Sequence, residues 1–324
     1  MRVIWALVTV AVLAVIGWGG YWFMGARSLD RTVERILAVN PAVDAADHRI
    51  AGFPNRFDLT VTEPRLERDG VRWSAPFIQF FALSYRLNHL IAVFPHDQQI
   101  GLGTHELTLH STDMRASVVM EPSLDLPLAR FALVAQEPAL RSGGETHRAD
   151  EARLASRARD TYRHQVAIEI ENARADTTAM DRLDPQGHWP RAFANIGLDA
   201  ELVFDRPLDR HALTGPPPGL AGFTLTGATL EFDTIRMIGE GRLTPDANGF
   251  LSGEMTLTVT NWRDLMRRAR DAGLMPAEHD TLITLGLESM TDPDNPDRLQ
   301  APLVLRDGDV LVGPVVLGTV PPLF

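Results

Sequence analysis

FDLTVT, residues 57–62, alternates apolar and polar side chains at every position. A period of two residues is typical of a β-strand with one buried face and one face in water. The alternation returns at residues 107–110, 166–170, 198–204, 223–232 and 255–260. The pairs Asp69-Gly70, Asn248-Gly249 and Asp307-Gly308 stand between such runs and favour tight hairpin turns. The sequence therefore predicts a mostly β (α+β) fold, a long curved antiparallel sheet with a few packed helices.

Three helices are expected beside this sheet, at residues 28–38, 262–272 and 278–290, because apolar residues recur there at helical spacing. Ser28 and Asn261 stand where N-caps are expected, and Gly273 stands where the second of these helices should stop. Residues 147–163 suit either a weak helix or an edge strand. The strand is favoured because DEARL at 150–154 echoes HELTL at 105–109.

The N-terminal segment from Val3 to Met24 carries no charge over about 22 residues, which as a helix is roughly 33 Å long. The hydrocarbon core of a bilayer is about 30 Å thick, so this run predicts a transmembrane helix. Trp18, Tyr21, Trp22 and Phe23 cluster at its C-terminal end, as in an interfacial aromatic belt. A cleaved signal peptide is the alternative, and the bulky residues before Gly25-Ala26 disfavour it. We expect an uncleaved anchor at 1–26, with Val3 and the four aromatic residues in the membrane.

The orientation of the body follows from two opposing signals. Arg27, Arg31 and Arg35 outnumber Arg2, and the positive-inside rule alone would place the C-terminal side in the cytoplasm. The cysteine-free, strand-rich body instead favours an envelope module. We expect a single-pass protein of the inner (cytoplasmic) membrane with a stalk helix at 27–40 and a β-rich periplasmic domain at 41–324. The Pro-rich segment 214–219 is the best candidate for an internal boundary.

Composition excludes several classes of function. The 324 residues include no cysteine, and every basic residue outside histidine is arginine. The absence of cysteine excludes thiolate metal sites and thiol catalysis, and the absence of lysine excludes P-loops and Schiff-base chemistry. A net charge of -11 without a basic stripe argues against nucleic acid as a partner.

A search for catalytic or metal-binding motifs identifies no site. The neighbours His96-Asp97 and His279-Asp280 would point to opposite faces of a strand, and the acidic loop 292–297 is stiffened by two prolines. The sequence contains no HExxH or GxSxG motif. We therefore name no catalytic residue, no metal and no cofactor, and we do not expect an enzyme.

Two segments, 77–83 and 90–94, are apolar without clean alternation. Buried core strands give this pattern, and so does the lining of a groove that carries acyl chains. The core is the default interpretation. In the groove hypothesis, the lining side chains are Phe77, Phe80, Phe81, Ile91 and Phe94.

Three stretches carry a resemblance: GFPNRFDL at 52–59, WSAP at 73–76 followed by ALSYRLNHLIAVFP at 82–95, and RDGDVLVGPVVLG at 306–318. In them the chain resembles an uncharacterised bacterial family, domain of unknown function 2125, over nearly its whole length, anchor included. These are turn and strand motifs without catalytic content, so the resemblance implies an envelope protein with no assigned activity. By architecture alone, the chain is also similar to AsmA-like envelope proteins implicated in moving lipid between membranes.

The expected function is a membrane-anchored, non-catalytic module that handles lipid or binds a hydrophobic ligand. The alternative is a structural scaffold that binds other envelope proteins. The expected partners are the inner membrane, lipid and other envelope proteins.

Overall fold

The computed structural model describes residues 2–68, 70–184, 186–213, 215–216, 218–246, 248–273, 280–312 and 315–322. The chain divides into two compact units, and each is described by itself. Unit 1 contains residues 1–133 and 209–217, and unit 2 contains residues 134–208 and 218–324. The recorded strand pairs inside both units are antiparallel, and helices are few. This confirms the predicted fold class, a mostly β protein behind an N-terminal apolar helix.

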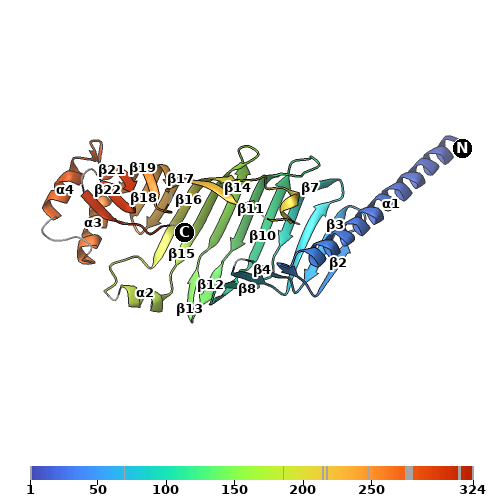
Figure 1. The fold of residues 1–324 in the computed structure, drawn as a ribbon, viewed down its shortest axis with the longest axis horizontal. Helices are drawn as coiled ribbons and strands as arrows, with labels where there is room; N and C mark the ends of the chain where they lie inside the picture. The colour runs from blue at the N-terminus through green and yellow to red at the C-terminus, as the bar shows by residue number, and fades with distance from the viewer. Residues whose placement is uncertain are drawn as a thin grey trace. The chain divides into compact units, whose positions relative to one another are not determined.

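The N-terminal helix α1 runs without a break from Arg2 to Val39. Figure 1 shows it as one continuous helix, and by its length and composition it is able to cross a membrane. The prediction of a separate helix at 28–38 was wrong at its start, because Ser28 is an interior residue whose carbonyl accepts a hydrogen bond from Thr32 Oγ1. Gly25 and Ala26 do not interrupt the helix. The segments expected to form an anchor and a stalk are therefore one continuous helix.

Unit 1 contains two antiparallel ladders. One has the order β2–β3–β6–β7–β10, and the other has the order β1–β4–β5–β8–β9. The bounds are β1 Val43–Asp44, β2 Asp47–Ala51, β3 Arg56–Thr62, β4 Arg65–Arg68, β5 Val71–Ser74, β6 Phe77–Leu83, β7 Arg86–Val93, β8 Asp97–Leu102, β9 His105–His110 and β10 Asp113–Met120, with a 3-10 helix at Arg210–Leu213. Strand β11 (Leu128–Gln136) spans the division between the units.

Unit 2 is a meander in which β14, β15, β16, β17, β18, β19 and β21 pair in that order. The bounds are β12 Ala139–Ser142, β13 Glu145–Arg148, β14 Glu151–Ala158, β15 Arg163–Arg174, α2 Thr177–Leu183, β16 Ala192–Phe204, β17 Leu220–Phe232, β18 Ile235–Pro245, β19 Leu251–Thr260, α3 Trp262–Asp271, α4 Asp280–Glu288, β20 Thr291–Asp292, β21 Asn295–Arg306, β22 Asp309–Val312 and β23 Val315–Thr319. The strand favoured for the ambiguous segment 147–163 is confirmed by β14.

The core of unit 2 lies where α3 and α4 pack on β18 and β21 (Figure 1). Trp262 of α3 is 1% exposed and packs with Val259, Leu299 and their neighbours. The predicted helix at 262–272 is confirmed, and Gly273 ends it with a φ of 71°. Asn261 does not cap this helix, because its own φ is 56° and its amide donates to the carbonyl of Thr234 instead. The start predicted for the next helix, Glu278, lies outside the described residues.

Candidate functional site

The candidate site is one face of the sheet in unit 2, and it follows from alternation combined with register. Leu154 on β14 pairs with Ile168 on β15, which pairs with Leu198 on β16, which pairs with Ala228 on β17. Paired residues of an antiparallel ladder point to the same face. These four side chains therefore form one apolar row across four strands.

A second apolar row lies beside the first, on the same face of the same strands. It consists of Ala152, Ile170, Ile196 and Leu230. Neighbouring strands lie about 4.8 Å apart, so each row is roughly 14 Å long from β14 to β17. Leu230 packs against the buried cluster around Trp262, and we call the other seven residues the open apolar face.

This face is exposed in the middle of the sheet. Ile168 and Leu198 are 39% and 41% exposed although each has a paired strand on both sides. Further along the same row, Leu257 and Ala301 pair with each other, and Ala301 is only 2% exposed within a cluster that includes Met255 and Val312. The described part of the chain thus covers one end of the row and leaves the other end in solvent.

The side chain of His164 borders the open apolar face. His164 pairs with Leu202 on this face, is 2% exposed, and lies 3.1 Å from Ser156 Oγ through Nδ1. Its ring meets that of Phe204 edge-on at 5.9 Å. Burial lowers the pKa of His164 below its ordinary value, and the nearby Asp160 carboxylate opposes this shift. Burial therefore favours the neutral form of the imidazole.

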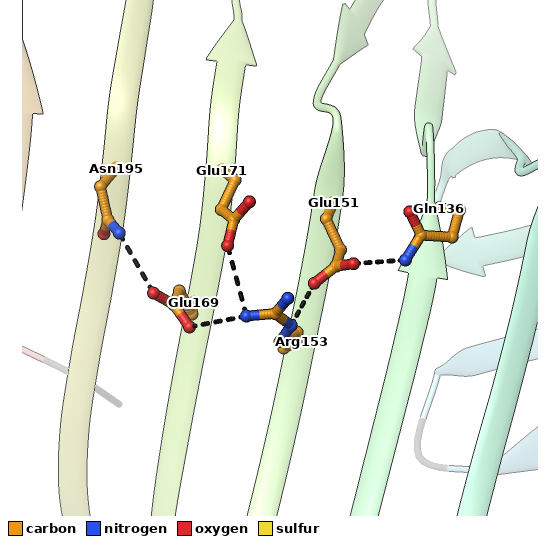
Figure 2. A network of polar contacts seen from close by, with 6 residues as sticks. All are labelled: Gln136, Glu151, Arg153, Glu169, Glu171 and Asn195. Atoms are coloured by element: carbon orange, nitrogen blue, oxygen red, sulfur yellow. Dashed lines mark hydrogen bonds and ion pairs between the residues drawn. The ribbon is translucent and has the colours of Figure 1, made fainter.

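The opposite face of the same strands is charged, as Figure 2 shows. Arg153 on β14 contacts Glu151 and lies 3.4 Å from Glu169 and 3.3 Å from Glu171 on β15. The network extends to Gln136, which donates to Glu151, and to Asn195, which donates to Glu169. Burial lowers the pKa of Arg153, but its ion pairs with the three glutamates outweigh that and raise it. The side chains of Arg153, Glu169 and Glu171 are 47%, 44% and 41% exposed, so this face stays in contact with water.

The polar groups elsewhere give no catalytic arrangement among the residues that the structure describes. No group of three or more His, Asp or Glu side chains in this part of the chain is placed to hold a metal ion. The backbone N–H of Trp189, 2.7 Å from Asp184, is the main cause that lowers the pKa of that carboxyl. This hydrogen bond stabilises a turn. The candidate site in unit 2 is therefore the open apolar face and not a group of polar side chains.

The five groove residues predicted from the sequence do not share one face of the sheet in unit 1. Phe80 pairs with Leu59 and Ala92, and Phe94 follows β7 with the same parity as Ala92. Phe77, Phe81 and Ile91 lie on the other face, where Phe81 pairs with Ile91. A single groove therefore cannot be lined by all five, and whether any of them binds a ligand stays a prediction.

These two groups of residues differ in their surroundings. Around Phe80 the face is well packed, with Ala92 and Ala116 each 4% exposed. Phe94 meets Trp73 edge-on at 6.2 Å. On the other face Phe77 and Ile91 are 37% and 40% exposed, and the Arg56 guanidinium lies 5.6 Å from the centre of the Phe81 ring.

The predicted anchor residues lie on α1. Trp22 is 6% exposed and stacks on Phe57 of β3 at 5.6 Å. Trp18 and Tyr21 are 38% and 39% exposed, and Phe23 is 64% exposed. Val3 belongs to the helix, but its side chain lies outside the described residues. One side of the aromatic cluster therefore packs on β3, and the other side is exposed.

Sequence reasoning did not single out Ile168 and Leu198. Their alternation predicted half-buried strands. It did not predict whether another element of the chain would cover these two side chains. The sequence does hold one signal, since the segment from 150 to 260 predicts many strands and no helix long enough to cover them. A sheet with too few helices leaves apolar surface open.

Comparison with known proteins yields one match. A family model described as "Uncharacterized protein conserved in bacteria (DUF2125)" matches residues 22–321. No curated protein and no solved structure matches the chain.

Proposed function

Since the chain belongs to the DUF2125 family of uncharacterized bacterial proteins, we propose its function from its own geometry: it is a membrane-anchored, non-catalytic module whose open apolar face binds a lipid acyl chain. The observation that carries the proposal is the exposure of Ile168 and Leu198 in the middle of a paired sheet. We further propose that the body lies in the periplasm and that α1 holds it at the inner membrane.

Water in contact with the open apolar face is energetically unfavourable. Covering apolar surface gains about 25 cal/mol per Å², so side chains left open in the centre of a sheet favour a ligand that covers them. Contiguous apolar patches on soluble domains are typical of binding surfaces. The charged network on the reverse face directs such a ligand to one side only.

The dimensions favour one acyl chain over a globular partner. The exposed row crosses four strands, roughly 14 Å. One leaflet of a bilayer, half of a hydrocarbon core of about 30 Å, is about 15 Å deep. The row is therefore about as long as one lipid tail, and it is narrow, with polar strand faces behind it. A chain that carries its own membrane helix has lipid at high local concentration.

The test uses two arginine substitutions at neighbouring positions of β15. Ile168→Arg places a charge on the open apolar face. Ala167→Arg places the same charge on the opposite face, where Ala167 pairs with Asp199. The full-length protein is purified in mild detergent, and its bound phospholipid is measured by mass spectrometry. Both variants keep α1, so lipid held around the helix is the same in both.

We expect Ile168→Arg to lose most of the lipid bound in excess of the helix-associated amount, and Ala167→Arg to retain it. Equal lipid content in the wild type and both variants would contradict the proposal. Recovery of a stoichiometric protein in place of lipid, lost in Ile168→Arg, would instead support the scaffold hypothesis.

A further inference from the structure

Two loops of unit 1 hold the anchor helix at its aromatic cluster. Trp18 Nε1 donates to the carbonyl of Pro54 at 2.9 Å, and Trp22 Nε1 donates to the carbonyl of Arg56 at 2.7 Å. The hydroxyl of Tyr21 donates to the carbonyl of Ser84 at 2.6 Å. We call these two loops together with the strand residues that border them, residues 52–56 and 83–87, the collar. The three donors follow one face of the helix, so the collar has a fixed level along α1.

The two loops of the collar are also bound to each other. Ser84 is fully buried, and its backbone N–H and its hydroxyl both donate to the carbonyl of Asn55, at 2.9 and 3.0 Å. Below them, the Phe57 ring fills the space beside Gly25, where an added Cβ would lie 2.7 Å from a ring carbon. The collar and this part of the helix are therefore one packed assembly.

The outer surface of the collar is apolar and aromatic. Phe53, Tyr85 and Leu87 are 54%, 69% and 54% exposed. Phe53 stacks on Phe23 of the helix at 5.7 Å, which joins the loop surface to the surface of the anchor. Arg86 beside them is exposed as well. Aromatic rings mixed with arginine are typical of residues at the boundary between lipid tails and headgroups.

The level of the collar along α1 lies on the lipid side of that boundary. The charge-free run ends at Met24, and Trp18 lies six residues earlier, about 9 Å along the helix axis. A run of roughly 33 Å centred on a core of about 30 Å places Tyr21 about 4 Å and Trp18 about 8 Å inside the edge of the hydrocarbon core. The collar, to which these residues donate hydrogen bonds, lies at the same depth.

The rest of unit 1 extends away from this level. From Trp22 the helix continues to Val39, about 26 Å further. There β1 pairs Val43 with Leu66 of β4, so β3 and β4 follow the helix away from the collar. In the second ladder, β1–β4–β5–β8–β9, the far end is reached at Leu102, which pairs with Val71. The collar is therefore the membrane-proximal edge of unit 1.

We propose that the collar is a bilayer-contacting surface, in which Phe53, Tyr85 and Leu87 insert into the headgroup boundary of the leaflet that α1 leaves. The occupant of this surface is the lipid bilayer itself. The contact holds the ladder β2–β3–β6–β7–β10 upright on the membrane through the loops as well as through the helix. This proposal is independent of lipid binding by unit 2, because it rests on unit 1 alone.

The experiment exploits the absence of cysteine from the chain. Leu87→Cys and Leu102→Cys are matched variants, since both leucines are exposed, at 54% and 45%, and they lie at opposite ends of unit 1. Leu13→Cys on the exposed part of α1 marks the membrane interior. Each full-length variant is labelled with a nitroxide and reconstituted in nanodiscs of phosphatidylethanolamine and phosphatidylglycerol. Paramagnetic relaxation by oxygen and by a water-soluble nickel complex then measures depth.

We expect the oxygen-to-nickel accessibility ratio at position 87 to be several-fold higher than at position 102 and lower than at position 13. Equal ratios at 87 and 102 would overturn the proposal. A label at 87 shielded from both reagents would also overturn it, because a protein would then cover the collar. Circular dichroism of each labelled variant checks the fold, and a label at the exposed Phe53 repeats the measurement on the second loop.

Discussion

The two ends of unit 2 are built from the same alternating strands and differ in what covers them. At β18, β19 and β21 the apolar face lies under α3 and α4, and Val259 and Leu299 are 1% and 5% exposed. At β15 and β16 the same face shows Ile168 and Leu198 at about 40% exposure. Alternation thus determines which way a side chain points, and a separate element determines whether it is buried. The uncovered end is where a ligand gains most by binding.

The stability of the covered end of unit 2 depends most on Trp262. Its indole is 1% exposed, and its Nε1 donates to the carbonyl of Pro296 at 3.1 Å. We expect Trp262→Ala to destabilise the protein by about 3–5 kcal/mol, since it leaves a large cavity and frees α3 from the sheet. Calorimetric unfolding measures the loss. Leu285→Ala on α4, where the leucine is 58% exposed, is the control and should change stability by no more than about 0.5 kcal/mol. Equal effects would mean that α3 does not cover the core.

A leucine pair compares the two ends directly. Leu299→Ala, at a 5% exposed position, is expected to cost about 2–5 kcal/mol. Leu198→Ala, at a 41% exposed position, should cost about 1 kcal/mol or less, because much of the side chain is already in water. Thermal unfolding of both variants gives the difference. A loss at Leu198 as large as at Leu299 would show that the open end is covered in solution.

The packing of α1 on unit 1 is a second covered surface, and Gly25 tests it. A methyl group there would lie 2.7 Å from the Phe57 ring, which is itself 5% exposed and stacked on Trp22. Gly25→Ala is expected to destabilise unit 1 by about 1–3 kcal/mol through overpacking. Gly20→Ala, on the same helix with nothing within 4 Å, should not. If both variants unfold at the wild-type temperature, the helix does not pack on β3 as described.

The smallest expected effect is the pH dependence from His164 at the border of the open face. Burial lowers its pKa below about 6.5, so the unfolded chain binds a proton at a higher pH than the folded one. Stability should therefore fall as the pH drops below about 6.5, before most carboxylates titrate near 4. His164→Gln should lose that component. Unfolding temperatures at pH 7.5 and 5.5 for both proteins measure it, and an identical fall in the variant would assign the dependence to other groups.

Much of the fold was predictable because strand alternation is a local property. The strands, the helix after Asn261 and the long apolar anchor are all encoded within a few neighbouring residues. Because alternate residues of a strand point to opposite faces, the sequence of β6 alone separates Phe80 from Phe77 and Phe81. Assigning Phe94 and Ile91 to a face required the register between β6 and β7. The break expected at Ser28 was wrong because an N-cap residue does not end a helix that hydrogen bonding continues.

The candidate site was harder to predict, because it depends on long-range coverage. Gly239 and Gly241 lie inside β18, where the Met255 side chain and the β19 backbone occupy the space beside them. Ile168 and Leu198 follow the same local pattern as Val259. Only the three-dimensional position of α3 distinguishes them.

The most direct test of the lipid-binding claim is photo-crosslinking at neighbouring positions of β16 in living cells. Benzoylphenylalanine replaces Leu198 on the open apolar face or Asp199 on the opposite face, both of which are exposed. Irradiation followed by mass spectrometry of the full-length protein identifies the adducts. We predict phospholipid adducts at position 198, at roughly ten times the yield at position 199. Equal yields at the two positions, or protein adducts alone at 198, would contradict lipid binding by this face.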